Sequence, residues 1–491
     1  MMQTRRILNN SAFVLAARIF EMIAGIIVMG ILARYLGVAD FGEYSLVMAL
    51  VWISIPIISI EVPRILAVEL SRSPQKTHTW LGNGLSMNIG VCLGLTLAIL
   101  VIDTFFHDLS LHYYTGLAIA LAISLTQSVG SVFIAREQMY YDTYTTLAVT
   151  LCLISLTSIV IIAGLGLAPI FITTLLAYTI GALIALAFAC KITGFWLRPS
   201  WDLQVLRQLL AGSIALSAVQ ILVQLLIYCG AFMLKQMTGN VEVALFQAPM
   251  RIFSRFIIVP MTLTVALLPI FCQMAACPAK QAELKKLTGN VLKFLLIIGM
   301  LVAIAAFALA DQLIPLVFGS SFADASAGFK ILVLGTIFSF INQFYVMLAM
   351  ACDRLRGLAT VKLGEFLVCL LLNFVLIPQL GHLGSIWAMT AAAGLGSLGG
   401  FLLFRDIVPM KSLAELLFVA ISGFTVIAGM AFFADAHYLI HLILGVVSFT
   451  AVQFICQIVS LKDLRRLLDQ LRQAKQPTTH ASILSPPQDS L

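Results

Sequence analysis

The chain has 491 residues, of which 61% are hydrophobic and 10% charged, with a formal net charge of +7. About a quarter of the residues of a soluble protein are charged, so this composition excludes a water-soluble enzyme and indicates a surface that mostly faces lipid. The Lys and Arg residues lie in short clusters between apolar runs and form no basic face, which argues against nucleic acid as a partner.

Apolar segments long enough to cross a bilayer as helices follow one another along the whole chain. The first is too long for the core of a signal peptide and should remain as a span. The fourteen segments lie near residues 12–36, 44–62, 81–102, 113–134, 144–164, 167–189, 209–234, 243–272, 291–310, 328–350, 359–377, 383–404, 412–433 and 438–459.

The distribution of Lys and Arg supports this count and sets the orientation. With the N-terminus inside, every predicted inside loop contains Lys or Arg, whereas the outside loops contain only Arg34 and Lys235. The sequence therefore predicts an all-α integral membrane protein with fourteen transmembrane helices and both termini in the cytoplasm.

An internal repeat accompanies the spans. Ser11 aligns with Ser213 and Gly37 with Gly239, at the same offset of 202 residues. Because the first and seventh spans both begin inside, we expect two six-helix lobes as parallel repeats, with a site between them. The predicted domains are an N-terminal lobe (1–190), a cytoplasmic linker (191–208), a C-terminal lobe (209–404), an extra helix pair (405–460) and a cytoplasmic tail (461–491).

Enzymatic motifs and cofactor sites are missing from the sequence. No GxxxxGK[ST] phosphate loop, HExxH or GxSxG motif occurs, and the nine cysteines form no CxxC pair. No predicted loop is long enough for a separate catalytic domain. We therefore expect no cofactor, no metal site and no enzymatic activity.

Ionisable residues within spans are the sharpest functional signal, since each costs about 2.5–3.5 kcal/mol at a helix centre. The first span contains Arg18 and Glu21, and the eighth contains Arg251 and Arg255. Arg251 and Arg255 are four residues apart on one helix face, and no acid lies within a turn of them. We predict that Arg18, Arg251 and Arg255, with Arg64 at the cytoplasmic end of the second span, bind an anionic substrate.

Local pairing is the alternative explanation for several of these charges. Arg18 and Glu21 are three residues apart, and so are Lys362 and Glu365 in the eleventh span, so each pair could neutralise itself. Glu21 and Glu365 are the candidate ion-coupling carboxylates. In the second and eighth spans, interruptions are expected from four prolines, Pro56, Pro249, Pro260 and Pro269.

Three connecting segments resemble those of bacterial polysaccharide flippases of the O-antigen (Wzx-like) type. They are residues 32–44 (LARYLGVADFGEY), 313–319 (LIPLVFG) and 373–384 (NFVLIPQLGHLG). With the span count, the resemblance covers about residues 5–460. It places the chain in the superfamily that also includes multidrug extruders and the lipid II flippase.

The resemblance implies a function, a location and partners. The family moves undecaprenyl-diphosphate-linked oligosaccharides, such as O-antigen, capsule or exopolysaccharide units, across the bacterial inner membrane by alternating access. A diphosphate is also the anion that the intramembrane arginines would suit. The implied partners are the lipid-linked glycan, membrane lipids, a glycan polymerase and a chain-length regulator.

Two other functional classes compete with a flippase. An ion-coupled drug extruder of the same superfamily would need acidic residues deep in its cavity, whereas the deep charges here are mainly arginine. A membrane glycosyltransferase or polymerase would need a carboxylate site and usually a large outer loop, and the longest outer connection, near residues 311–326, is short.

Overall fold

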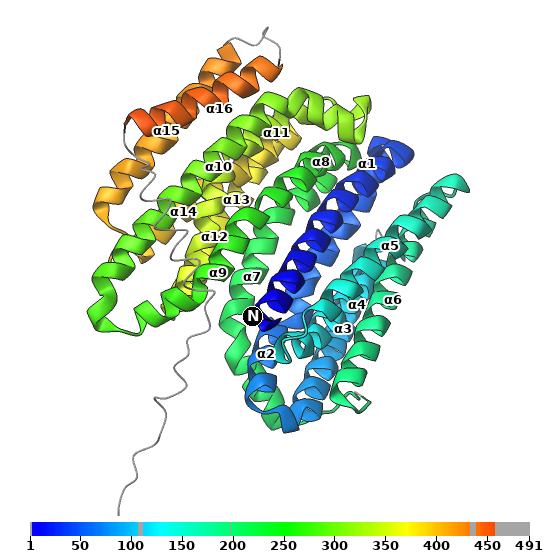
Figure 1. Ribbon diagram of the computed structural model, residues 1–491. Helices are drawn as coiled ribbons and strands as arrows, with labels where there is room; N and C mark the ends of the chain where they lie inside the picture. Colours follow the sequence, from blue (N-terminus) through cyan, green and yellow to red (C-terminus); the bar gives the residue numbers. More distant parts are fainter. Residues whose placement is uncertain (1, 107–110, 197, 433–437, 457–491) are drawn as a thin grey trace, which may run out of the picture. The chain divides into compact units, whose positions relative to one another are not determined.

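The computed structural model describes residues 2–106, 111–196, 198–432 and 438–456, without the side chains of residues 2–19, 74, 102, 105, 106 and 410–413. Within this part of the chain all regular structure is helical (Figure 1). The helices are α1 (Met2–Ser59), α2 (Val62–Arg72), α3 (Thr77–Phe106), α4 (Leu111–Ala135), α5 (Tyr140–Ile162), α6 (Leu167–Thr193), α7 (Leu203–Met237), α8 (Asn240–Phe256), α9 (Ile258–Ala275), α10 (Gln281–Phe318), α11 (Ala325–Leu334), α12 (Thr336–Ala351), α13 (Leu355–Leu380), α14 (His382–Leu403), α15 (Met410–Phe432) and α16 (Tyr438–Ile455), with short 3-10 turns η1 (Pro74–Lys76), η2 (Pro278–Lys280) and η3 (Ser320–Phe322).

The described helices account for the predicted spans. Twelve stretches are long and apolar enough to cross a membrane, and α11 with α12, interrupted at Gly335, makes a thirteenth. One stretch, Phe20–Arg72, has 53 residues, which is about 80 Å of helix for a hydrocarbon core of about 30 Å. It therefore supplies two crossings, joined at Gly37, where the backbone leaves helical geometry. The predicted all-α membrane fold is confirmed, and fourteen spans are reached by counting in this way.

Glycine makes the turn at two corresponding places. Gly37 has φ 73° and ψ 177°, and Gly239, between α7 and α8, has φ 98°. A residue with a Cβ rarely adopts a positive φ, whereas glycine does so without strain. The repeat aligns these two glycines, so both repeated turns share this backbone feature, while the lobe boundaries at residues 190 and 209 stay a prediction.

Prolines end two helices by the same mechanism. Because the proline ring collides with the carbonyl group four residues earlier, a helix tends to stop there. α1 ends at Ser59, four residues before Pro63, and α8 ends at Phe256, four residues before Pro260. The predicted interruption is thus seen at Pro260. At Pro56 it is wrong, since Pro56 lies inside α1 and Pro63 explains the break.

The same correction applies to two further prolines. Pro249 lies inside α8 and Pro269 inside α9, and neither helix is interrupted at these positions.

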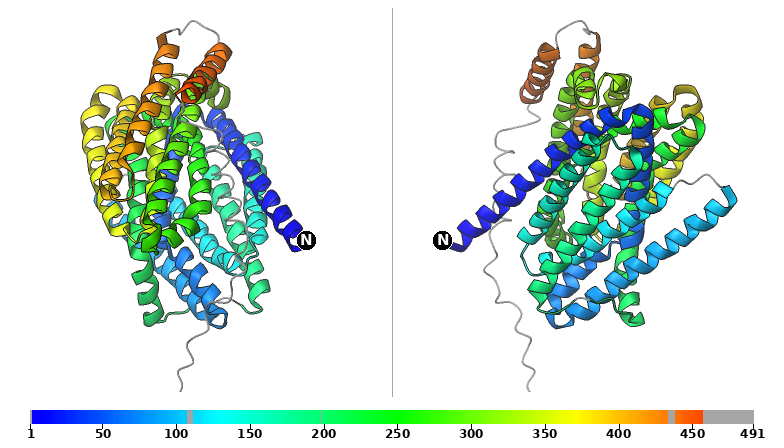
Figure 2. Two further views of the ribbon diagram at one scale, coloured as in Figure 1. Left: turned by 60° about the vertical axis from the view of Figure 1, so that its left-hand side comes forward. Right: turned by 90° about the vertical axis from the view of Figure 1, so that its right-hand side faces the viewer.

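The helices form two compact units. Unit 1 is Met1–Arg255, Ala310–Gly335 and Leu355–Gly396, and unit 2 is Phe256–Leu309, Thr336–Arg354 and Ser397–Leu491. In unit 1, α4 packs against α1 and α6, α5 against α6, and α7 against α13 (Figure 2). In unit 2, α9 packs against α12 and α15 against α16. The contacts of α1, α4, α5 and α6 in unit 1 frame the cavity described below.

Close contact between α1 and the start of α8 requires a glycine. A Cβ on Gly42 would overlap the backbone carbonyl of Asn240, which cannot turn aside as a side chain does. Gly42→Ala should therefore destabilise the protein by about 1–3 kcal/mol. Gly94→Ala on α3 is the matched control, because nothing lies within 4 Å of its added Cβ. Thermal unfolding in detergent measures both, and equal melting temperatures would contradict this packing.

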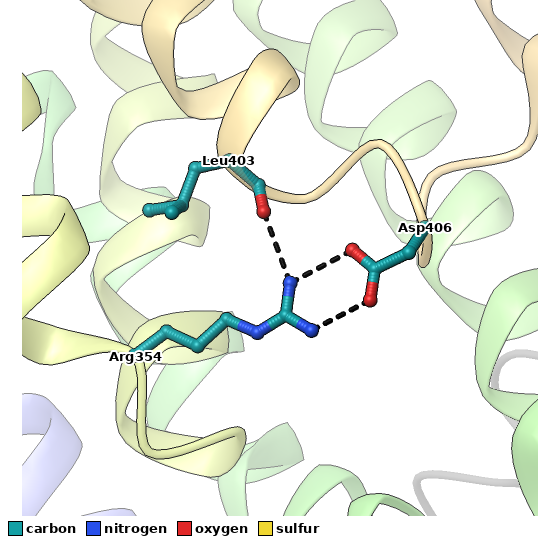
Figure 3. Close-up of polar contacts among 3 residues, drawn as sticks. All are labelled: Arg354, Leu403 and Asp406. Carbon is teal, nitrogen blue, oxygen red and sulfur yellow. Dashed lines mark hydrogen bonds and ion pairs between the residues drawn. The ribbon is translucent and has the colours of Figure 1, made fainter.

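An ion pair in unit 2 joins the residue before α13 to the residues after α14. Arg354 Nη1 donates to Asp406 Oδ1 (2.7 Å) and to the Leu403 carbonyl oxygen (3.0 Å), and Arg354 Nη2 donates to Asp406 Oδ2 (2.6 Å) (Figure 3). This two-point geometry is the strong form of the Arg–carboxylate pair. Hydrogen bonding to Arg354 lowers the pKa of the Asp406 carboxyl, and the same contact raises the pKa of Arg354.

The direction of the Asp406 shift predicts a pH dependence of stability. A depressed folded-state pKa stabilises the protein above the unfolded value of about 4, and this contribution is lost as pH falls through the folded-state pKa. Both side chains are more than one-third exposed, so the contribution at pH 7 is under about 1 kcal/mol. Melting temperatures from about pH 7 to pH 3 should decline less steeply in Asp406→Asn than in wild type. Identical slopes would show that the pair does not form in solution.

Candidate functional site

Unit 1 contains a cavity of about 460 Å³, lined by α1, α4, α5, α6 and α8. A volume of this size lies within the range of roughly 300–1,000 Å³ that is typical of small-molecule sites. The lining is mixed, with apolar side chains beside charged, hydroxyl and aromatic ones. Its charged residues are Glu21, Asp142, Arg251 and Arg255.

Two predicted cations enter the cavity from α8. Arg251 and Arg255 lie one turn apart, and the helix places its apolar residues, such as Phe246 and Phe253, in the protein interior. Arg251 Nε and Nη2 and Arg255 Nε are buried and have no hydrogen-bond partner among the described residues. An unpaired buried donor costs about 1–3 kcal/mol, more when charged. These donors therefore favour a ligand that supplies acceptor oxygens.

The first helix approaches Arg255 closely because it has no side chain at Gly25. A Cβ at this position would lie 2.9 Å from Arg255 Nη2. Glu21, one turn earlier on α1, lines the same cavity and interacts electrostatically with Arg255, as do Tyr178 and Tyr228. The structure thus brings one predicted coupling carboxylate and two predicted substrate arginines into one cavity.

Asp142 is a second cavity carboxylate, and the sequence analysis missed it. The fifth span was predicted to begin at residue 144, which left Asp142 in a loop. In the structure α5 begins at Tyr140, and Asp142 lies in its first turn and lines the cavity. An acid in the first turn of a helix is favourable, which was a usable signal for an earlier start.

Threonines form a polar wall of the cavity that the sequence analysis also missed. α5 contributes Thr145, Thr146, Thr150 and Thr157, whose spacing places them on one helix face. Thr126 of α4 and Thr174 of α6 add to this wall. Threonines that recur at helical spacing in the fifth span were the sequence signal that could have predicted this wall.

Three aromatic residues with polar tips complete the lining: Tyr44 and Trp52 of α1 and Tyr178 of α6. Trp52 Nε1 is buried and has no hydrogen-bond partner among the described residues. A tryptophan N–H normally finds a partner when it is buried. Trp52 therefore offers one more donor to a ligand with acceptor groups.

The remaining predicted site residues lie elsewhere. Arg64 is at the start of α2, 46% exposed, with its Nε 3.0 Å from Glu61 Oε2, and it does not line the cavity. The backbone of Arg18 belongs to α1, but its side chain lies outside the described part of the chain. The substrate-binding roles of Arg64 and Arg18 stay predictions.

Glu365 forms a buried pair on α13 instead of lining the cavity. Lys362 Nζ donates to Glu365 Oε2 at 2.6 Å, and the two side chains are 4% and 1% exposed. Glu365 Oε1 has no hydrogen-bond partner among the described residues, and a Cβ at Gly396 on α14 would overlap the carboxylate. The geometry is that of the local pair considered above, and the ion-coupling role of Glu365 stays a prediction.

Comparison with known proteins indicates a family. Residues 7–275, more than half of the chain, match the family described as polysaccharide biosynthesis protein. A search of curated proteins by sequence finds no match.

Solved structures show which fold the chain has. The lipid II flippase MurJ in an inward closed conformation is similar, with a TM-score of 0.69 at 14% identity, covering 91% of this chain and 99% of that one. An inward-facing multidrug resistance MATE family transporter of the MOP superfamily has a TM-score of 0.60 at 14% identity, covering 81% and 95%. A MOP superfamily transporter from Pyrococcus furiosus, described as having a binding pocket of reverse polarity, has a TM-score of 0.58 at 15% identity, covering 82% and 93%. These likenesses show that this chain shares its fold with the three proteins.

Proposed function

This chain belongs to the polysaccharide biosynthesis protein family, and from that membership we propose that it is a flippase for a lipid-linked oligosaccharide. The substrate would be an undecaprenyl-diphosphate-linked glycan, such as an O-antigen, capsule or exopolysaccharide unit. The protein would move it from the inner to the outer leaflet of the bacterial cytoplasmic membrane by alternating access.

The observation that carries this proposal is the pair of arginines on one face of α8. Arg251 Nε and Nη2 and Arg255 Nε are buried without a hydrogen-bond partner among the described residues, and both side chains line a cavity of about 460 Å³. Guanidinium groups bind phosphate oxygens in a two-point geometry and stay charged when partly desolvated. A diphosphate supplies the acceptors and the negative charge that Arg251 and Arg255 can satisfy.

Coupling to the membrane potential or to an ion gradient would drive the transport. One elementary charge moving through 100 mV provides about 2.3 kcal/mol. Glu21 is the carboxylate that we propose for coupling, because it lines the same cavity as Arg255 and interacts electrostatically with it. A substrate phosphate bound at Arg255 would change the charge that Glu21 experiences. A glycan polymerase and a chain-length regulator are the proposed partners.

Reconstitution into liposomes tests the proposal directly. A polyprenyl-diphosphate-linked oligosaccharide would be placed in both leaflets, and its accessibility to an added glycosidase would be followed over time. Liposomes containing the protein should expose all of the substrate, whereas empty liposomes should expose about half. Half-exposure in the presence of correctly folded protein would reject the flippase function.

A drug or small-cation extruder is the second candidate function. Glu21 and Asp142 both line the cavity, and carboxylates are the groups that would attract a cationic drug. Ethidium efflux from liposomes under an imposed ion gradient tests this function. Efflux that disappears in Glu21→Gln and Asp142→Asn, without any movement of the lipid-linked glycan, would establish the extruder instead.

A further inference from the structure

Four of the six threonine hydroxyls that line the cavity use their proton in the same way. Each donates its proton to a backbone carbonyl four residues earlier in its own helix: Thr126 to Ala122 (2.8 Å), Thr145 to Tyr141 (2.9 Å), Thr150 to Thr146 (2.9 Å) and Thr174 to Ile170 (2.7 Å). A hydroxyl has one donor and two acceptor lone pairs. With the donor occupied, these four threonines can offer only acceptor sites to a ligand.

The charged residues of the lining are likewise either acceptors only or donors only. Glu21 and Asp142 are acceptor-only when ionised, and they belong to α1 and α5. Arg251 and Arg255 are donor-only and belong to α8, and the buried Trp52 N–H is a donor as well. The cavity therefore has an acceptor wall, defined as Thr126, Thr145, Thr150 and Thr174 with the two carboxylates, and a donor side on α8. Glu21 lies at the boundary of the two, because it interacts electrostatically with Arg255. Thr146, Thr157, Gln127, Tyr44 and Tyr178 can act in either way.

We propose that the acceptor wall is the glycan subsite and that it selects neutral or amino sugars over acidic sugars. This inference rests on the proposed function and adds the substrate class. The hydroxyl and amide N–H groups of a neutral sugar are donors that the wall can accept. The carboxylate of a uronic acid has no proton to donate, and Glu21 and Asp142 would repel it at close range.

The two sides suit the two ends of one substrate. Arg255 approaches α1 at Gly25, and α1 packs against α5, so a single helix joins the donor side to the acceptor wall. A diphosphate held by Arg251 and Arg255 would place the first sugars of its glycan against α5. The apolar lining residues, such as Val28 and Met29, can contact the apolar faces of sugar rings.

Binding measurements with three synthetic probes test the subsite. The probes are farnesyl diphosphate, farnesyl diphosphate linked to N-acetylglucosamine, and farnesyl diphosphate linked to glucuronic acid. Dissociation constants would be measured by calorimetry on the purified protein in detergent at about pH 7. We expect the N-acetylglucosamine probe to bind about tenfold more tightly than farnesyl diphosphate, on the scale of one or two neutral hydrogen bonds. The glucuronate probe should bind no more tightly than farnesyl diphosphate.

A double variant assigns the gain to the threonines. Thr145→Val with Thr150→Val keeps the β-branched shape on α5 and removes two acceptors. It should abolish the tenfold gain for the N-acetylglucosamine probe and leave the affinity for farnesyl diphosphate unchanged. Thr143→Val is the matched control, because Thr143 lies on the same helix, bonds its own backbone and does not line the cavity.

The outcomes separate this inference from the proposed function. A glucuronate probe that binds as tightly as the N-acetylglucosamine probe, or a double variant that weakens all three probes equally, would overturn the acceptor wall while leaving diphosphate binding intact. Failure of every probe to bind, or binding of every probe that Arg255→Ala does not weaken, would instead reject the proposed function.

Discussion

Arg255→Ala should lower glycan transport by roughly 100-fold while membrane abundance stays normal. The loss corresponds to one charge-assisted, two-point contact with the diphosphate. Abundance should change little, because Arg255 Nε has no hydrogen-bond partner among the described residues and because Glu21, which interacts electrostatically with Arg255, still shares the cavity with Arg251. Arg255→Lys should retain part of the transport activity. Lysine keeps the positive charge, but it lacks the planar guanidinium group that contacts two phosphate oxygens at once. Surface glycan and immunoblots of the membrane fraction measure the two quantities in the same cells.

Arg356→Ala is the control for this prediction. It removes an exposed cation at the start of α13 and should leave transport unchanged. If Arg255 is an internal structural partner, truncation costs several kcal/mol and the protein level falls together with transport. Normal export by an abundant Arg255→Ala protein would end the case for Arg255 as a diphosphate ligand.

Lys362→Met should be the most destabilising single change in α13, by about 3–5 kcal/mol. Removing Lys362 leaves the Glu365 carboxylate buried without its counter-charge, which is the costly way to break a buried ion pair. The double variant Lys362→Met with Glu365→Gln removes both charges and should recover much of the loss. Melting temperature in detergent and membrane abundance are the measurements, with Lys330→Met, a more exposed lysine on α11, as the control.

The same variants decide whether Glu365 couples ions. A structural pair predicts that stability and transport fall together in Lys362→Met and recover together in the double variant. A coupling carboxylate predicts that the double variant is stable and still fails to transport. A Lys362→Met protein with wild-type abundance and melting temperature would refute the structural pair.

The fold class and the positions of the spans follow from local properties of the sequence. Within a bilayer each backbone polar group must be satisfied inside the protein, so a long apolar run has little choice but to be a helix. Glycines with positive φ and prolines that end helices also act through the local backbone. For this reason the corresponding positions Gly37 and Gly239 could be recognised from their offset of 202 residues. The error at Pro56 arose because the relevant proline, Pro63, lies just beyond the predicted span.

The candidate site could be predicted only in part. Arg251 and Arg255 were recognisable because charge is expensive within a span, and their spacing of four residues alone put them on one face. Glu21 was recognised for the same reason. The sequence does not show that α1 comes close to Arg255, because this contact depends on how α1 and α8 pack at Gly25.

Tertiary structure alone decided which polar groups share the cavity and which do not. Asp142 and the α5 threonines meet the arginines because four other helices surround the same space, and helix rotation selects the face that each one presents. Arg64 and Glu365 are of the same residue types as the charged residues of the cavity, but they lie elsewhere in unit 1. There Arg64 pairs with Glu61, and Glu365 pairs with Lys362. The sequence by itself determined where the charges lie along each helix, because burial cost acts on single residues. Packing determined which of those charges can reach one ligand, because that is a property of several helices at once.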